Sequence, residues 1–313
     1  MIEARHLTKR YGSKLAVDQL SFTVRPGVVT GFLGPNGSGK STTMRMIVGL
    51  DAPDGGDVTV NGQRYHDLPW PLHEVGALLE AKAIHPGRSA RAHLQMLALS
   101  NRIAPRRVEE VLDLVGLADV AGQRAGKFSL GMGQRLGIAA ALLGDPQVLL
   151  FDEPVNGLDP DGIRWVRNLL KGLAREGRAV FVSSHLMSEM ALTADEVVII
   201  GKGRLIAELS VDELLAGSAQ RYVRVRSPEA DRLQAALVAD GATAVREHDG
   251  SLSVRGCDEV AVGELAAAMH VVLHELAPQT ASLEEAFMEL TESSIEYHGA
   301  PTLGVAVPSG GAA

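Results

Sequence analysis

The sequence predicts an α/β protein in which a large domain with a parallel sheet precedes a small α+β domain. Three observations support this fold class. A glycine-rich loop joins an apolar strand to a helix within residues 28–49, strands alternate with helices from residue 148 onward, and a βαββαβ order follows residue 217. Strands that alternate with helices form parallel sheets with helical crossovers.

Composition fits a folded globular chain and narrows its function. The 313 residues are 46% hydrophobic and 22% charged, as in ordinary globular domains. The formal net charge of −8 argues against a general nucleic-acid binder, because such proteins usually carry a basic excess. Cys257 is the single cysteine, so the chain can form neither an internal disulfide nor a cysteine metal cluster.

The sequence contains no segment that predicts membrane insertion. No window approaches the ~20 apolar residues of a membrane span, and the first residues lack the apolar core of a signal peptide. We therefore expect a cytoplasmic chain whose membrane role, if it has one, comes through a partner.

The elements of the large domain follow from their hydrophobic periods. Apolar and β-branched residues alternate at period two in residues 1–11, 20–27 and 56–65, which indicates strands. Residues 89–145 are predicted to be mainly helical, because apolar residues recur there at a spacing near 3.6. Further segments complete the pattern, with strands at 148–154, 179–185 and 196–208 and a helix at 162–177.

A boundary is predicted near residues 214–220, where small residues separate two patterned regions. The order that follows is βαββαβ, with an Asp249-Gly250 hairpin turn, and it is the pattern of a ferredoxin-like small domain. A last helix carries Leu283, Phe287 and Leu290 at helical spacing. The predicted domains are 1–217, 218–297 and a disordered Gly-, Pro- and Ala-rich tail at 298–313.

The segment "GPNGSGKS" matches the phosphate-loop pattern G-x-x-x-x-G-K-[ST]. Backbone NH groups of such a loop converge on phosphate oxygens at the start of a helix. Lys40 adds positive charge near the outer phosphates, and the Ser41 hydroxyl can ligate Mg²⁺. The predicted nucleotide-binding residues are Gly34, Pro35, Asn36, Gly37, Ser38, Gly39, Lys40, Ser41 and Thr42.

The apolar run "VLLFDEP" ends in two carboxylates, Asp152 and Glu153. Adjacent residues of a strand point to opposite sides, so the two groups should do different work. Beside a phosphate loop, Asp152 can hold Mg²⁺ through its water shell. Glu153 can orient the attacking water or accept its proton.

With these motifs, residues 1 to about 217 resemble the ATP-binding subunit of an ABC transporter. The resemblance implies a cassette with an N-terminal antiparallel β-subdomain and a helical subdomain. It also implies ATP and Mg²⁺ as ligands and hydrolysis of ATP coupled to transport. Five positions match the family's remaining motifs: Ser129 and Gly131 in the signature at the head of a helix, Asp159 in the dimer-contact loop, the switch residue His185, and the adenine-stacking residue Tyr11.

Two departures from the family pattern narrow the resemblance. Leu130 and Met132 replace the first glycine and the glutamine of the family's signature. Glu80 stands where the family places a glutamine that contacts metal and water; a carboxylate can still ligate Mg²⁺, but it adds negative charge beside three phosphates. With both departures, the chain resembles the branch of ABC subunits that serves bacterial export of drugs, peptide antibiotics or lipids.

The resemblance also implies two partners. A second copy of the chain would close the ATP site with the start of its own signature helix, forming an ATP-sandwich homodimer. A separate integral membrane permease would use the opening and closing of this homodimer. It would also hold the chain at the cytoplasmic side of the membrane. No nucleic-acid partner is expected.

Two other functions use parts of the same pattern. The first alternative is a soluble ABC-type ATPase acting on ribosomes or DNA; the single cassette and the acidic balance weigh against it. The second is a small-molecule kinase or GTPase that shares only the phosphate loop. It would have no use for Ser129, Gly131 or His185, and the sequence lacks the N-K-x-D motif that reads guanine.

Overall fold

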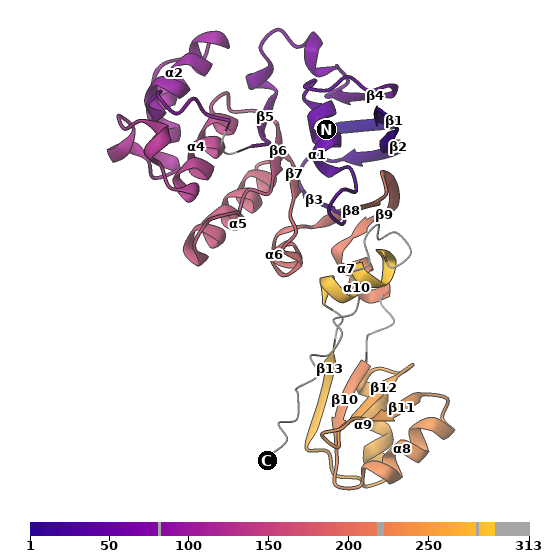
Figure 1. The fold of residues 1–313 in the computed structure, drawn as a ribbon. Helices are drawn as coiled ribbons and strands as arrows, with labels where there is room; N and C mark the ends of the chain where they lie inside the picture. The colour runs from indigo at the N-terminus through magenta and orange to yellow at the C-terminus, as the bar shows by residue number, and fades with distance from the viewer. Residues whose placement is uncertain (81–82, 218–221, 280–281, 292–313) are drawn as a thin grey trace, which may run out of the picture.

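The computed structural model describes residues 1–80, 83–217, 222–279 and 282–291 (Figure 1). A six-stranded sheet forms the centre of its larger part. In spatial order the strands are β5 (Val75–Leu78), β6 (Val148–Asp152), β7 (Ala179–Ser183), β3 (Val29–Leu33), β8 (Glu196–Gly201) and β9 (Arg204–Ser210). Neighbouring strands are parallel except β8 and β9, which form a hairpin. The parallel order places the ends of β3, β6 and β7 at one edge, where the predicted site residues follow them.

A second, antiparallel sheet comes from the first 60 residues. Its order is β2 (Lys14–Val24), β1 (Ile2–Tyr11) and β4 (Gly55–Val60). Between the two sheets, Phe22 stacks on Phe32 and Phe181 with ring centroids 5.6 and 5.4 Å away. Helix α1 (Lys40–Ile47) contributes Met44 and Ile47 to the same apolar core. This core fixes the phosphate loop, because α1 begins directly after it.

The region from residue 89 to 145 is helical, as the 3.6 spacing predicts. It contains α2 (Ala90–Ser100), α3 (Arg106–Leu114) and α4 (Leu130–Leu142). Two single 3-10 turns lie in the same region, at Ala118–Val120 and Ala125–Lys127. Two more lie in the loops before it, at Tyr65–Asp67 and Pro71–His73. The apolar faces of the three helices pack into one core with the central sheet. They lie on the face opposite the one that packs on β1, β2 and β4.

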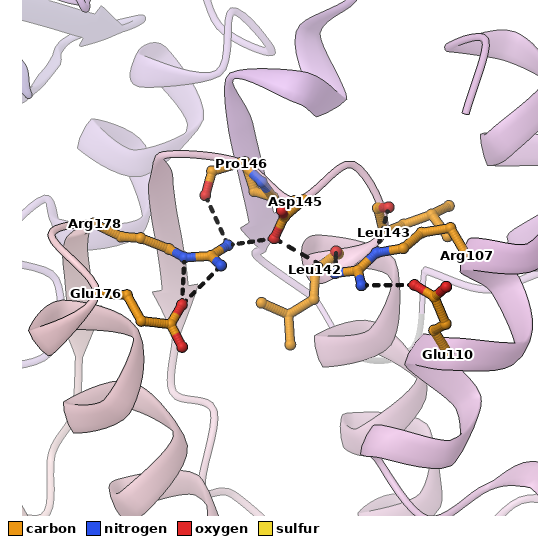
Figure 2. Close-up of polar contacts among 8 residues, drawn as sticks. All are labelled: Arg107, Glu110, Leu142, Leu143, Asp145, Pro146, Glu176 and Arg178. Atoms are coloured by element: carbon orange, nitrogen blue, oxygen red, sulfur yellow. Dashed lines mark hydrogen bonds and ion pairs between the residues drawn. The ribbon is translucent and has the colours of Figure 1, made fainter. Parts of the chain in front are cut away.

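A polar junction fixes the end of α4 to the central sheet (Figure 2). Arg107 on α3 donates from Nη2 to the carbonyl oxygen of Leu142 and from Nε to that of Leu143, at 3.1 and 3.3 Å. Asp145 Oδ1 lies 3.5 Å from Nη2 of Arg107 and 2.9 Å from Nη1 of Arg178, at the start of β7. The carbonyls at the end of α4 thus receive donors, and Asp145 joins α3 to the sheet.

Three further helices of the larger part follow strands of the sheet. They are α5 (Pro160–Arg175), α6 (Met187–Thr193) and α7 (Val211–Gly217). Arg167 on α5 pairs with Glu189 on α6 at 2.5 Å. Val166 and Leu170 of α5 are buried against the sheet.

The small domain has the predicted βαββαβ order. Its elements are β10 (Tyr222–Arg226), α8 (Ala230–Ala239), β11 (Thr243–Arg246), β12 (Leu252–Arg255), α9 (Glu259–Ala268) and β13 (Glu275–Gln279). The strand order β11-β12-β10-β13 is antiparallel throughout, as in a ferredoxin-like sheet. The last strand begins at Glu275, four residues later than the apolar run at 271–278 indicates, because Val271 is buried in the core before the strand starts. The domain has an apolar core of its own.

The last helix does not join the small domain. Helix α10 (Leu283–Thr291) packs on α6 and α7, and Figure 1 shows it beside α7. Leu283 and Phe287 enter the core of the larger part together with Val211 and Leu214. The predicted tail at 298–313 lies outside the described residues. Among the described helices, none is long and apolar enough to cross a membrane.

Candidate functional site

The predicted phosphate loop forms the turn between β3 and α1. Gly39 precedes the helix with φ of 106°, a backbone conformation that residues with a side chain rarely adopt. A Cβ at Gly39 would lie 2.5 Å from the carbonyl oxygen of Ala16, so only glycine fits the position. The chain therefore enters α1 with its first NH groups free of intrahelical partners, the arrangement that binds phosphate at helix N-termini.

An open cavity of about 710 Å³ lies over the phosphate loop, a volume in the range of small-molecule sites. Residues from five separate parts of the chain line it. They include Tyr11, Asn36, Gly37, Ser38, Gly39, Lys40, Ser41, Thr42, Glu80, Gln134, Asp152, Glu153 and Asn156. The structure thus brings Tyr11, Glu80 and the two carboxylates to the loop, although they are far apart in the sequence.

Lys40 is folded back onto the phosphate loop. Its Nζ donates to the carbonyl oxygens of Gly34 and Pro35, at 2.6 and 3.2 Å. Burial lowers the pKa of Lys40, and the nearby Glu153 and Asp152 partly oppose that shift. The ammonium group therefore lies at the phosphate loop, and Lys40 lines the cavity above it.

Asp152 and Ser41 are in direct contact. Ser41 Oγ donates to Asp152 Oδ2 at 2.8 Å, and the hydroxyl of Ser183 donates to Asp152 Oδ1. The described residues contain no group of three or more His, Cys, Asp or Glu that could hold a metal ion. Mg²⁺ nevertheless keeps several waters and takes only one or two carboxylates, with phosphate oxygens completing its shell. The oxygens of Ser41, Asp152 and Glu80 in this cavity fit that preference.

Glu153 turns away from Asp152 and toward the end of β7. His185 Nδ1 lies 2.7 Å from Glu153 Oε2, and the backbone NH of His185 donates to the same oxygen at 3.3 Å. Glu153 has φ of 52°, in the left-handed region that residues other than glycine rarely adopt. Its backbone NH donates to Ser183 Oγ at 3.1 Å. A carboxylate held against an imidazole beside a phosphate loop can orient a water or take its proton.

Tyr11 stands at the edge of the cavity in a network that sequence analysis missed. Its hydroxyl donates to Asp51 Oδ2 at 2.7 Å, and Arg45 Nε donates to the same oxygen at 2.7 Å. The hydrogen bond to Asp51 raises the pKa of Tyr11. Arg45 and Tyr11 together lower the pKa of Asp51. The network fixes the aromatic ring; Asp51 belongs to no motif, so only the contact itself identifies it.

The residues of the predicted signature lie at the start of α4. Ser129 caps this helix, since its Oγ accepts from the NH of Met132 at 3.2 Å. Ser129 lines a second cavity, of about 410 Å³, rather than the one over the phosphate loop. A Cβ on Gly131 would lie 3.2 Å from the carbonyl oxygen of Gly157. Asp159 caps α5 by accepting from the NH of Gly162 at 2.9 Å.

Two further cavity residues, Gln134 and Asn156, were not predicted. Gln134 lies in α4 and donates from Nε2 to the carbonyl oxygen of Glu153 at 2.8 Å. The NH of Asn156 donates to the same oxygen at 3.2 Å. Neither contact leaves a signal in the sequence, because a glutamine in a helix and an asparagine in a loop are ordinarily solvent-exposed.

Comparisons with known proteins match both parts of the chain. The family model described as ABC transporter matches residues 17–156, and a domain of unknown function (DUF8746) matches residues 221–284. The ABC transporter ATP-binding protein YhcH of Bacillus subtilis (strain 168) is 40% identical over 301 residues, which cover 95% of this chain and 97% of that protein.

Two further similarities each cover about two thirds of the chain. The bacitracin transport ATP-binding protein BcrA of Bacillus licheniformis is 42% identical over 217 residues, covering 68% of this chain and 71% of that protein. The dimeric, post-hydrolysis structure of the ATP-binding cassette MJ0796 bound to ADP and Pi is 25% identical, with a TM-score of 0.62. That match covers 67% of this chain and 99% of that one.

Proposed function

Because the chain belongs to the ABC transporter family as an ATP-binding subunit, we propose that it energises export of a drug, antibiotic or lipid-like compound through a separate membrane permease. As a member of this family it binds and hydrolyses ATP in a cycle coupled to transport. The similarity to a bacitracin transport protein supports the export of an antibiotic-like compound. In this proposal the permease holds the chain at the cytoplasmic face of the membrane and selects the compound.

The proposal assigns a role to each group of the cavity. The NH groups of the phosphate loop and Lys40 bind the phosphates. Ser41, Asp152 and Glu80 would hold Mg²⁺, which neutralises charge on the phosphates when bound. Glu153 orients the attacking water and accepts its proton, while His185 holds the Glu153 carboxylate and contacts the γ-phosphate. Tyr11 stacks on adenine.

A second copy of the chain completes the site in this proposal. The position of Ser129 and Gly131 at the first turn of α4 supports it, because NH groups and a positive dipole end there can bind a phosphate that the other copy presents. Asp159 contributes to the contact between copies. ATP then joins the two cassettes and hydrolysis releases them, which gives the permease an opening and closing movement.

The single observation that carries the ATP-hydrolysing part of the proposal is the Glu153–His185 contact beside the phosphate loop. Neither a small-molecule kinase nor a GTPase that shares only the loop would need it. The alternative of a ribosome- or DNA-acting ATPase keeps the same catalytic groups and differs in its partner. The deciding experiment is therefore purification of the full chain from detergent-solubilised membranes. Recovery of an integral membrane protein with drug-stimulated ATPase activity supports export, and co-sedimentation with ribosomes instead contradicts it.

A further inference from the structure

Gln134 is a buried polar side chain whose position is hard to explain by packing alone. It is 3% exposed, and its Oε1 is buried without a hydrogen-bond partner among the described residues. An unpaired buried acceptor costs free energy, which an apolar side chain of similar size would avoid. An amide is needed at this position for one interaction, the hydrogen bond that Gln134 Nε2 donates to the Glu153 carbonyl oxygen.

That carbonyl belongs to a backbone under strain. Glu153 keeps its left-handed φ of 52° directly before Pro154. Such a conformation persists only where the surroundings hold it. Asn156 and Gln134 both donate to the carbonyl oxygen, and Ser183 receives the backbone NH. Gln134 is the donor that comes from the helical region rather than from the carboxylate's own sheet and loop.

Gln134 also lies between the two ends of α4. Ser129 caps the start of the helix, and its last turn lies at the junction in which Arg107 binds the carbonyls of Leu142 and Leu143 (Figure 2). A helix of this length is a stiff rod of about 20 Å. Since its last turn is fixed to the sheet, a displacement of its first turn is transmitted to the Glu153 carbonyl through Gln134.

We propose that Gln134 is a positioning residue, which couples the placement of the α4 N-terminus to the placement of the Glu153 carboxylate in the same chain. The inference rests on the proposed function, in which Ser129 and Gly131 contact the nucleotide of the partner copy. Closure of the two copies then aligns Glu153 for hydrolysis through Gln134. Gln134 is 3% exposed and acts through the Glu153 carbonyl, so its loss should lower turnover and have little effect on nucleotide binding.

The first test replaces the amide with an apolar group of similar length, in Gln134→Met. We expect kcat of the full chain to fall roughly 10- to 100-fold, as for a misplaced catalytic group. KM and the Kd for ATP should stay within about twofold, and Tm should not fall, because no unpaired polar atom remains. Gln95→Met, on the exposed surface of α2, is the matched control and should keep all four values.

The second test, Gln134→Glu, has a readout that a packing role would not move. The ionised carboxylate repels the Glu153 carbonyl oxygen, whereas the protonated form can donate to it. Burial raises the pKa of such a carboxyl group, so the rate relative to the parent chain should rise as pH falls from about 8 to about 6. A constant ratio across this range contradicts the inference.

The third test separates this inference from the proposed function. In a Glu153→Gln background, Gln134→Met should reduce residual single-turnover hydrolysis no further, because Gln134 acts only through Glu153. Parent-level turnover of Gln134→Met, or a full additional loss in the double variant, overturns the positioning role and leaves the proposed function intact. Parent-level turnover of Glu153→Gln alone overturns the catalytic assignment, and the inference with it.

Discussion

The imidazole Nδ1 of His185 lies 2.7 Å from Oε2 of Glu153, although the two residues follow different strands, β6 and β7. The adjacent, parallel strands bring them together, since parallel strands end at the same edge of a sheet. The contact gives the Glu153 side chain a defined direction, away from Asp152. The two carboxylates thus have different partners: Ser41 and Ser183 for Asp152, and His185 for Glu153.

Glu153→Gln should nearly abolish ATP turnover and leave ATP binding intact. The amide keeps the shape of the side chain but cannot accept the proton of the attacking water, and loss of a general base costs roughly 100- to 10,000-fold in rate. The variant should also accumulate as an ATP-bound dimer. Steady-state ATPase assays and size-exclusion chromatography with ATP test both expectations.

Glu284→Gln is the matched control, because it makes the same change on the exposed surface of α10. It should keep the ATP turnover of the parent chain. It should also be monomeric once it has hydrolysed the added ATP. Hydrolysis by Glu153→Gln at the parent rate would show that the role given to Glu153 is wrong.

Tyr11→Ala should weaken ATP binding roughly tenfold, because stacking of a base on an aromatic ring is worth about 1–3 kcal/mol. Tyr11→Phe keeps the ring and removes only the hydroxyl that donates to Asp51. Its affinity should therefore stay within about threefold of the parent. Titration with a fluorescent ATP analogue measures both. Equal affinities of the alanine variant and the parent would mean that the ring does not contact adenine.

The network around Tyr11 predicts an acid-sensitive contribution to stability. Arg45 and Tyr11 lower the pKa of Asp51 below its ordinary value of 3.8, so the ionised carboxylate is favoured in the folded chain. The stabilisation is fully present above the unfolded-state pKa and is lost as pH falls through the lower folded-state value. Urea unfolding should show Asp51→Asn less stable than the parent at about pH 7. The difference should shrink as pH falls below the ordinary carboxyl pKa of 3.8, and a difference independent of pH contradicts this account.

The sequence was sufficient where local pattern determines structure. The phosphate loop, the carboxylates after an apolar run and the βαββαβ order each depend on residues close together in the chain. Gln134 and Asp51 were missed because their importance comes from contacts across the fold with Glu153 and Tyr11. Periodicity predicts the last helix, but it cannot say which core receives Phe287.

Arg107 should stabilise the junction at the end of α4. Its guanidinium donates to the carbonyl oxygens of Leu142 and Leu143, and its side chain is 28% exposed. Arg107→Met leaves those carbonyls without this donor and should lower the free energy of unfolding by about 1–2 kcal/mol. The neighbouring Arg106 is 87% exposed, so Arg106→Met should stay within about 0.5 kcal/mol of the parent. Equal stabilities of the two variants in urea would remove the role given to Arg107.

Replacement of Phe287 tests whether α10 stabilises the cassette or the small domain. The ring is 6% exposed and lies in the core that contains Val211 and Leu214. Phe287→Ala should lower the free energy of unfolding of the cassette by about 3 kcal/mol, as for a large-to-small change in a core. Met288→Ala, at a side chain that is 50% exposed, should change it by about 0.5 kcal/mol or less. ATP protects the cassette by binding its folded state. The transition weakened in Phe287→Ala should therefore be the one that ATP shifts upward in calorimetry; if the other transition is weakened, α10 stabilises the small domain instead.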